Sequence, residues 1–396
     1  MSSTEIGYIR KELPEKIKTI GLTLFVVGTA LGIIGFLIDP QRASLSYLVT
    51  FMFLVSIGVG SLFLVALEYA VGADWSTPFR RISEFLAAVI PFLIILVIPL
   101  LFNLKYIFPW THKSIVDSSI MLRGKTPYLN VPFFIIRSIG IFLVWWVFYY
   151  FIIRNSRKQD TTKDQYLTKK NINISSGFIP VFGLSISAIA FDWMMSLEPN
   201  WFSTIFGVYY FSGTVWCALA ALTLIVILLN EHGYLHSKIK SEHYYTLGLL
   251  MFAFTVFWAY IAFSQYLLIW YADLPDETIW FMHRWVGGWK VVSLAIVFTH
   301  FIFPFFYLLS YNVKMQAKKL KFIAIWILCA HFLDLYWLVM PGMSTNGYQY
   351  SFSWMDLVFP VAAVGLIILI FKSLSHKYNL LPIGDPKLQR GLDFHL

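Results

Sequence analysis

The chain has 396 residues, of which 58% are hydrophobic, 19% aromatic and only 13% charged, and its formal net charge is +9. Soluble domains contain about 25% charged residues. This composition, with a mean hydropathy of +0.69, excludes a soluble protein and indicates an all-α, polytopic membrane protein. The positive charge does not imply nucleic-acid binding, because basic residues collect in the cytoplasmic loops of membrane proteins.

Ten apolar segments are long enough to cross a bilayer, which needs about 20 residues per helix. They cover residues 19–38, 47–70, 82–103, 133–153, 177–197, 204–229, 245–271, 284–310, 320–340 and 354–372. The first segment follows a charged N-terminus without a small-residue cleavage site. We therefore interpret it as a retained helix rather than a signal peptide.

The basic residues are divided unequally between the connections. Most of the 30 lysines and arginines lie before the first segment or after an even-numbered one. Because cytoplasmic loops carry the excess of Lys and Arg, both termini are predicted to be cytoplasmic. An odd number of helices would break this alternation, so the charges support ten.

The two cysteines, Cys217 and Cys329, both fall inside apolar segments. They cannot form a CxxC pair, a c-type haem attachment or a four-cysteine iron–sulfur site. We therefore expect this chain to bind neither a redox cofactor nor a metal. Quinol and lipid are the small molecules that it could contact.

Three ionisable residues share one depth inside the apolar segments. Asp192, Lys290 and Asp334 lie on three different helices, each roughly 7–9 Å below the outer surface from the helical rise. Charges at membrane depth are costly unless paired or hydrated, and they mark candidate functional positions. Their common level predicts a buried ionic cluster or the floor of an outward-facing water cavity.

Two histidines lie deeper, near the midplane. His331 shares a helical face with Asp334, because the two are three residues apart, and His300 has a matching depth on the neighbouring segment. Glu68 and Glu231 lie near the inner surface. Read from the outer to the inner side, this series predicts a proton pathway. Its members are Asp192, Lys290, Asp334, His331, His300, Glu68 and Glu231.

Other interpretations of these residues stay open at this point. A midplane histidine is more often a hydrogen-bonded packing residue than a proton carrier. His300 and His331 could also be the axial ligands of a b-type haem. Glu68, Glu84 and Glu231 are close enough to the inner surface to reach water or to pair with Arg80 and Arg81, and we favour this interpretation for Glu84.

Three stretches of the sequence are similar to a known family. FDWMMSLEPNWFSTIFGVYYFSG (191–213), WAYIAFSQYLLIWYADLPDET (258–278) and HFLDLYW (331–337) resemble the smaller of two related membrane subunits of bacterial alternative complex III. That complex is a quinol:cytochrome c oxidoreductase, and both subunits belong to the polysulfide-reductase, or NrfD-like, family. The resemblance runs across nearly the whole chain and implies a location in the bacterial cytoplasmic membrane.

The resemblance also implies how the chain is organised. Residues 1–46 would hold the cytoplasmic N-terminus and first helix, 47–203 a first four-helix bundle, 204–353 a second one, and 354–396 the last helix and a cytoplasmic tail. The implied partners are a larger NrfD-like sister subunit, an iron–sulfur/molybdopterin-like peripheral subunit, multihaem cytochrome c subunits and membrane lipids. Haem c and the iron–sulfur clusters would belong to those partners.

A quinone site in this family lies near the outer face of the first bundle and uses a carboxylate and a histidine. Asp192 matches the place of the carboxylate, but TFMFLVSIG (50–58) supplies no histidine. Gln265 and Tyr266, inside the seventh segment, are further candidates for contacting a quinone head group. The resemblance therefore implies proton conduction and assembly beside a quinol-oxidising sister, without catalytic residues in this chain. Direct quinol binding is the alternative.

A secondary transporter is a further alternative from a different class. Transporters of that kind usually have short helices broken by Gly or Pro at matching places in two halves. Here Pro91 and Pro99 interrupt the third segment, but the seventh segment contains no corresponding prolines. This pattern gives the transporter interpretation little support.

Overall fold

The computed structural model describes residues 11–343 and 352–396, and within these residues the chain is all-helical. Ten spans in that part are long and apolar enough to cross a membrane, which confirms the predicted number. They are Glu15–Ile38, Pro40–Val71, Thr77–Phe102, Val131–Thr162, Tyr166–Leu197, Phe206–Glu231, Ser241–Ala272, Trp289–Leu309, Ala317–Gly342 and Met355–Lys377. The start of the predicted N-terminal region and the middle of the connection between the last two spans lie outside the described residues.

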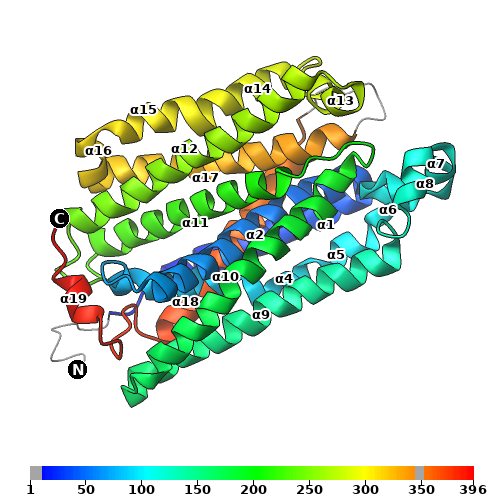
Figure 1. Cartoon of the computed structure of the whole chain (residues 1–396). Coiled ribbons are helices and arrows are strands. Elements are labelled where there is room, and N and C mark those ends of the chain that lie inside the picture. Colours follow the sequence, from blue (N-terminus) through cyan, green and yellow to red (C-terminus); the bar gives the residue numbers. More distant parts are fainter. Residues whose placement is uncertain (1–10, 344–351) are drawn as a thin grey trace.

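Seven of these spans are built on one uninterrupted long helix each (Figure 1). They are α1 (Glu15–Ile38), α2 (Pro40–Val71), α9 (Val131–Thr162), α10 (Tyr166–Trp193), α11 (Phe206–Glu231), α12 (Ser241–Ala272) and α18 (Met355–Lys377). The ninth is α17 (Ala317–Val339), which continues into a short 3₁₀ turn.

Prolines interrupt the remaining two spans, because proline lacks the amide proton that an α-helix needs. The third span consists of the 3₁₀ turn η1 (Thr77–Phe79), α3 (Arg80–Ala87), α4 (Ile90–Leu96) and α5 (Ile98–Phe102). Pro91 and Pro99 stand in the first turns of α4 and α5. The eighth consists of α14 (Trp289–Ile296), the π-helical stretch η4 (Val297–Ile302) and α15 (Phe303–Leu309).

The helices form two groups of four. One contains α2, the third span, α9 and α10, and the other contains α11, α12, the eighth span and α17. The first helices of the two groups, α2 and α11, pack against each other and are the most buried spans. Gly60 allows this contact, since a Cβ at that position would lie 2.8 Å from the Thr214 carbonyl oxygen on α11. Small residues let membrane helices approach in this way.

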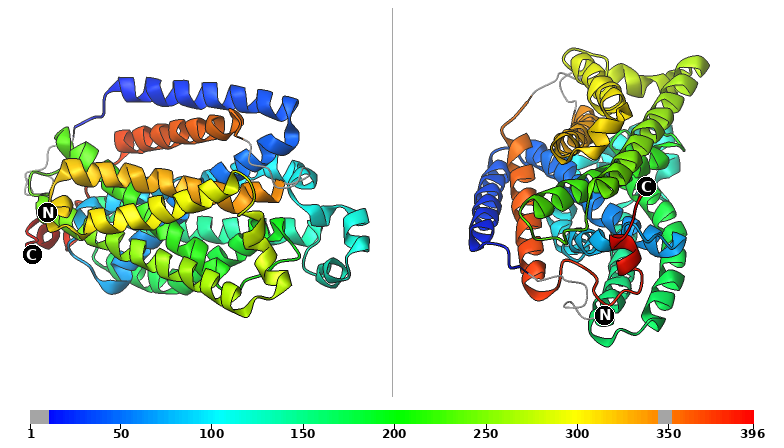
Figure 2. Two further views of the ribbon diagram at one scale, coloured as in Figure 1. Left: turned by 90° about the horizontal axis from the view of Figure 1, so that it is seen from above. Right: turned by 90° about the vertical axis from the view of Figure 1, so that its left-hand side faces the viewer.

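Helices α1 and α18 form a separate pair beside the two groups (Figure 2). The buried residues of α1 are all glycines: Gly21, Gly28, Gly32 and Gly35. A Cβ at Gly28 would lie 2.6 Å from the backbone nitrogen of Ala362 on α18. The pair is therefore held by close backbone approach rather than by large interlocking side chains.

Short helices lie between the spans. α6 (Leu104–Ile107), α7 (Lys113–Ser118) and α8 (Ile120–Lys125) cover the first group at the end opposite the C-terminus, which we call the outer end. There Trp110 donates to Ser196, and Lys125 donates to the Pro199 carbonyl. The others are α13 (Pro275–His283), α16 (Tyr311–Met315) and α19 (Leu388–Leu392).

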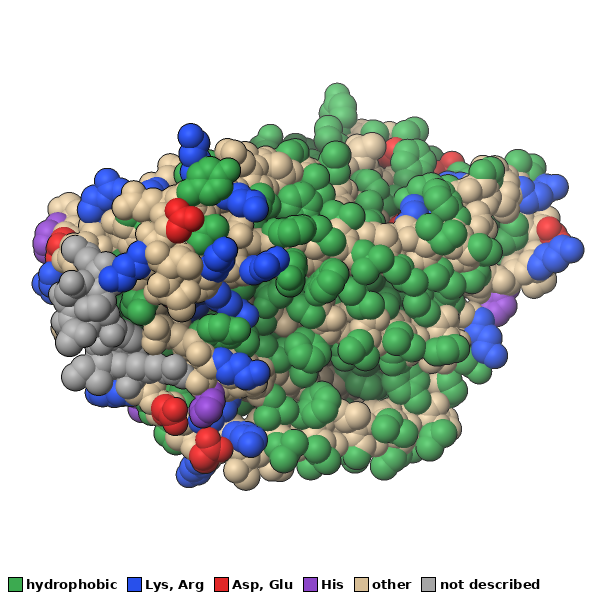
Figure 3. Space-filling view, turned by 90° about the horizontal axis from the view of Figure 1, so that it is seen from below, with side chains coloured by type: hydrophobic (Ala, Val, Ile, Leu, Met, Phe, Trp, Pro, Cys, Tyr) green, Lys and Arg blue, Asp and Glu red, His purple; other side chains and the backbone are tan. Residues whose placement is uncertain are grey.

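The surface carries a wide hydrophobic band between two polar ends (Figure 3). Lys and Arg side chains gather mainly at the end where the C-terminus lies. The beginning of the described chain is at the same end, because Lys372 donates to the Leu13 carbonyl oxygen at 2.6 Å. The location of both chain ends on one side agrees with an even number of spans. The cytoplasmic location of this end stays a prediction. We refer to it below as the inner end.

Candidate functional site

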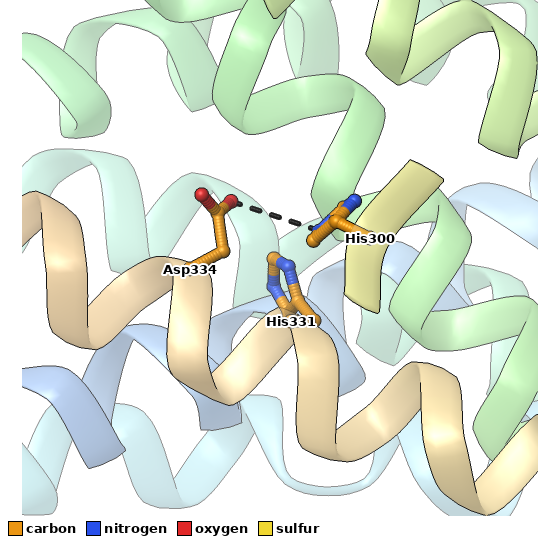
Figure 4. Close-up of side chains that lie close together, drawn as sticks. All are labelled: His300, His331 and Asp334. Atoms are coloured by element: carbon orange, nitrogen blue, oxygen red, sulfur yellow. Dashed lines mark ion pairs between the residues drawn. The ribbon is translucent and has the colours of Figure 1, made fainter. Parts of the chain in front are cut away.

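His300, His331 and Asp334 come together in the interior of the second helix group (Figure 4). His300 lies on η4, and the other two lie on α17. At most 1% of each residue is exposed. The His300 Nε2 and Asp334 Oδ2 atoms are 3.8 Å apart, and one ligand atom from each of the three residues lies within 4.8 Å of the others. We call these residues the His–His–Asp cluster.

The His300 ring is held between two tryptophans. Its centroid is 4.2 Å from that of Trp216 on α11 and 3.7 Å from that of Trp258 on α12. Within the described residues, neither ring nitrogen of His300 has a hydrogen-bond partner. Single π-helical turns are rare and often occur at functional sites. Here such a turn carries an imidazole whose ring is fixed by stacking and whose nitrogens are left available.

His331 is oriented by a hydroxyl group. Its Nε2 atom lies 3.0 Å from Ser56 Oγ on α2, and Ser56 has the Met52 carbonyl oxygen as its own acceptor at 3.1 Å. We therefore assign the proton to Nε2, which leaves Nδ1 with a lone pair and no partner in the described part of the chain. Gly213 on α11 makes room for this ring, since a Cβ there would lie 2.9 Å from Nδ1.

Asp334 is hydrogen-bonded rather than paired with a strong cation. The Tyr209 hydroxyl on α11 donates to its Oδ1 atom at 2.5 Å. Within residues 11–343 and 352–396, the ion-pair contact found for Asp334 is the one with His300. A carboxyl group at membrane depth without Lys or Arg is able to take up and release a proton, and a neighbouring imidazole is a suitable exchange partner.

The residues that complete the cluster were not predicted. They are Ser56, Tyr209, Trp216 and Trp258, which come from three other helices. Each is an ordinary residue of an apolar segment, and only the packing of α2, α11 and α12 against α17 and η4 gives it a role.

Asp192, the first residue of the predicted pathway, has a different environment. It is fully buried, and Arg137 on α9 donates two hydrogen bonds to its carboxylate at 3.0 and 2.9 Å. The guanidinium carbon of Arg137 also lies 3.7 Å from the ring centroid of Tyr128. Such a bidentate, stacked arginine neutralises the carboxylate and fixes its position.

Lys290 does not join either carboxylate. Its side chain is exposed on α14, and its ammonium nitrogen lies 5.4 Å from the centroid of the Trp285 ring. The predicted common depth of Asp192, Lys290 and Asp334 therefore does not produce one ionic cluster in the described structure. The helices carry these residues toward different neighbours.

Glu68 lies in an ionic network at the inner end. It is 3.0 Å from Arg80, which also contacts Asp385 at 2.5 Å in the C-terminal segment. In the same region, Arg81 contacts Glu84 and Asp160, each at 2.6 Å. The expected pairing of Glu84 with Arg81 is thus confirmed. Glu231 stands apart, since it is partly exposed and paired with Lys321 at 2.5 Å.

The C-terminal segment that follows α18 closes over this network and touches both helix groups. The Gly384 amide donates to Asp160 on α9, and His243 on α12 donates from Nε2 to the Gly391 carbonyl oxygen at 2.9 Å. Burial alone would raise the pKa of Asp385, but the Arg80 guanidinium and the Lys387 amide outweigh it and hold that pKa below its usual value.

This lowered pKa predicts that the docking of the C-terminal segment depends on pH. A depressed carboxyl pKa stabilises the folded state above the unfolded pKa of about 3.9, and the contribution is lost as pH falls through the folded pKa. We expect amide hydrogen exchange in residues 380–393 to be slow at neutral pH and to show a loss of protection on strong acidification. Asp385→Asn should remove this pH dependence, and an unchanged profile would contradict the assignment.

Gln265 and Tyr266, the quinone candidates on α12, point in different directions. Gln265 is 3% exposed, and its Oε1 atom has no hydrogen-bond partner among the described residues. Tyr266 is 45% exposed and contacts the Phe281 ring. Neither residue shares a hydrogen bond with Asp192 in the described structure.

Further ion pairs around two carboxylates at the outer end were not predicted. Arg42 on α2 pairs with Asp356 on α18, and Ser46 donates to the same carboxylate at 2.6 Å. Glu198 contacts Arg284 at 2.7 Å and His283 at 2.9 Å. Burial would raise the pKa of Glu198, but these two basic groups keep it below its usual value.

The fold and the site together define a multi-pass, all-helical membrane protein with a buried His–His–Asp cluster. A comparison with protein-family models and a search of curated proteins gave no match for this chain.

Proposed function

We propose that this chain is an integral membrane subunit of a respiratory quinol:cytochrome c oxidoreductase of the alternative complex III type. In this proposal it conducts protons and supports assembly in the bacterial cytoplasmic membrane, while partner subunits carry the redox centres. The ten apolar spans and the resemblance of residues 191–213, 258–278 and 331–337 to membrane subunits of that complex support it.

One observation carries the proton-conducting role. The His–His–Asp cluster places a carboxyl group and two imidazoles in the membrane interior, and three of the four imidazole nitrogens lack hydrogen-bond partners in the described chain. Buried polar atoms without partners are rare in native structures and call for an explanation, such as a proton relay or an ordered water molecule. Ionisable groups in such positions are typical of proton pathways in membrane pumps.

A route from the cluster to the inner end can follow α2. Ser56 contacts His331, and Glu68 lies twelve residues further along the helix, roughly 18 Å away by the helical rise. Ser61, between them, is fully buried, and its hydroxyl has no partner among the described residues. Ordered water molecules could bridge these steps. The route replaces Asp192, Lys290 and Glu231 of the predicted pathway with Ser56 and Ser61.

Direct quinol binding by this chain is the alternative function. Its expected carboxylate, Asp192, is already satisfied by Arg137, which weakens that interpretation. A photoreactive quinone that labels this chain near Asp192 would favour it. The b-type haem interpretation would require a haem band in the reduced-minus-oxidised spectrum of the isolated chain.

The membership of a complex is tested by purification from native membranes. We expect an affinity-tagged chain to copurify with multihaem cytochrome c, a larger membrane subunit and an iron–sulfur protein. The purified assembly should reduce cytochrome c with a quinol. A stable lone chain that transports a solute in vesicles would refute the proposal and support a transporter.

A further inference from the structure

We propose that His300, His331 and Asp334 form a binding site for a divalent transition-metal ion, for which Zn²⁺ is the representative. The proposal differs from the sequence-based expectation that this chain binds no metal. That expectation was based on the absence of cysteine motifs. It rests on side-chain positions that only the folded chain creates.

The donor atoms suit zinc. Neutral imidazole nitrogens and carboxylate oxygens bind Zn²⁺ at about 2.0–2.2 Å, so two ligands of one ion lie roughly 3.3–4 Å apart. The His300 Nε2 to Asp334 Oδ2 distance is 3.8 Å, and the third ligand atom lies within 4.8 Å. These separations are short enough for small side-chain adjustments to bring all three atoms around one ion. The three protein ligands would leave a fourth position open.

The nitrogens that would bind the ion are available. Within the part of the chain that the structure describes, both nitrogens of His300 and the Nδ1 atom of His331 have no hydrogen-bond partner. Buried histidines can also use both ring nitrogens in hydrogen bonds, as His243 shows. Its Nε2 donates to the Gly391 carbonyl, and its Nδ1 accepts from the Lys240 amide at 3.2 Å.

Neighbouring side chains orient the ligands. In the assigned tautomer Ser56 accepts from His331 Nε2, which leaves the lone pair of Nδ1 unused, and Tyr209 donates to Asp334. Trp216 and Trp258 fix the plane of His300. Metal-binding histidines usually use their second nitrogen, and ligating carboxylates their other oxygen, for this kind of support.

Charge also favours a cation here. The Asp334 carboxylate would be buried at membrane depth without a lysine or arginine partner among the described residues. An uncompensated buried charge is strongly unfavourable, and a bound cation would compensate it. Asp192 offers no comparable site, because Arg137 already occupies both of its oxygens.

Zinc binding would compete with protons for the same lone pairs, because metal ligands must be deprotonated. In this respect the proposal deepens the proposed function, since zinc would block a proton route through the cluster. The binding itself does not rest on that function. It is measured without turnover, whereas proton transfer is measured without zinc, so failure of one proposal is separable from failure of the other.

The test uses the full-length chain in detergent after treatment with a chelator. Equilibrium dialysis against zinc chloride, followed by elemental analysis, should show one zinc ion per chain that Asp334→Asn and His300→Gln remove. Cobalt(II) should give a visible absorption band typical of a tetrahedral site, and the same substitutions should abolish it. The buried control His243→Gln should keep both signals.

Ser56→Ala is the second variant, since it keeps all three ligands and removes the hydroxyl that supports His331, together with the contacts of that hydroxyl to Met52, Tyr210 and Thr214. We expect it to weaken zinc binding by about 10–100-fold. Elution volume and near-ultraviolet circular dichroism identify variants that fail to fold. If the wild-type chain binds no zinc, or the same amount as folded Asp334→Asn and Ser56→Ala, the proposal is wrong.

Discussion

Asp334→Asn is expected to remove most proton release per electron from the assembled complex while leaving assembly nearly intact. Asparagine has the same shape as aspartate, and it can still accept the Tyr209 hydrogen bond. It cannot take up and release a proton, so the His300–Asp334 step is lost. The measurement is the number of protons released per electron, followed with a pH-sensitive dye in vesicles that contain the purified complex.

The chain provides a matched control in Asp192→Asn, which changes another buried carboxylate on a span of the same direction. Because Asp192 is held by Arg137 rather than by imidazoles, this variant is expected to lower stability more than proton coupling. Normal turnover with unchanged coupling in Asp334→Asn would show that the cluster is not on the proton route. Equal coupling losses in both variants would show that the effect is not specific to the cluster.

Arg137→Met is expected to destabilise the first helix group by about 3–5 kcal/mol, because removing one partner leaves a buried charge uncompensated. Asp192 is fully buried, and each oxygen of its carboxylate accepts one hydrogen bond from Arg137. Arg137→Lys should recover only part of the loss, since an ammonium group cannot form the bidentate contact. The measurement is the free energy of unfolding in detergent micelles, obtained with a chemical denaturant.

A double-mutant cycle tests the physical reason. Replacing both partners of a buried ion pair with apolar residues is often neutral, so Arg137→Met combined with Asp192→Leu should restore most of the lost stability. The coupling free energy of the cycle isolates the pairwise contribution. If the losses of the two single variants simply add, the ion pair does not explain the stability of this region.

These two predictions differ although the two carboxylates look alike in the sequence. Asp192 and Asp334 each precede a proline by seven residues, near the outer end of a span. The first meets an arginine from α9, and the second meets a histidine from η4 and a tyrosine from α11. One is therefore a structural anchor, and the other is a group whose charge can change.

The coarse fold follows from the amino-acid sequence alone. Ten apolar runs of bilayer length define ten spans, because backbone groups without hydrogen bonds are too costly inside lipid and a helix satisfies these groups within one segment. The sequence also predicts the depth of each ionisable residue, since the helical rise is constant. Local pairs such as Arg81 with Glu84 could be predicted because they are three residues apart on one helix.

Which residues come into contact depends on how the helices pack. Depth is one coordinate, whereas the rotation of a helix about its axis and the identity of its neighbours depend on packing between helices that are distant in sequence. The Lys290 side chain is therefore exposed on the surface of the structure although its predicted depth matches that of Asp192 and Asp334. Ser56 supports His331 although the two residues are 275 positions apart in the chain. Small residues such as Gly60 and Gly213 allow the close helix approach that brings these side chains into contact. Hydropathy gives no information about this packing.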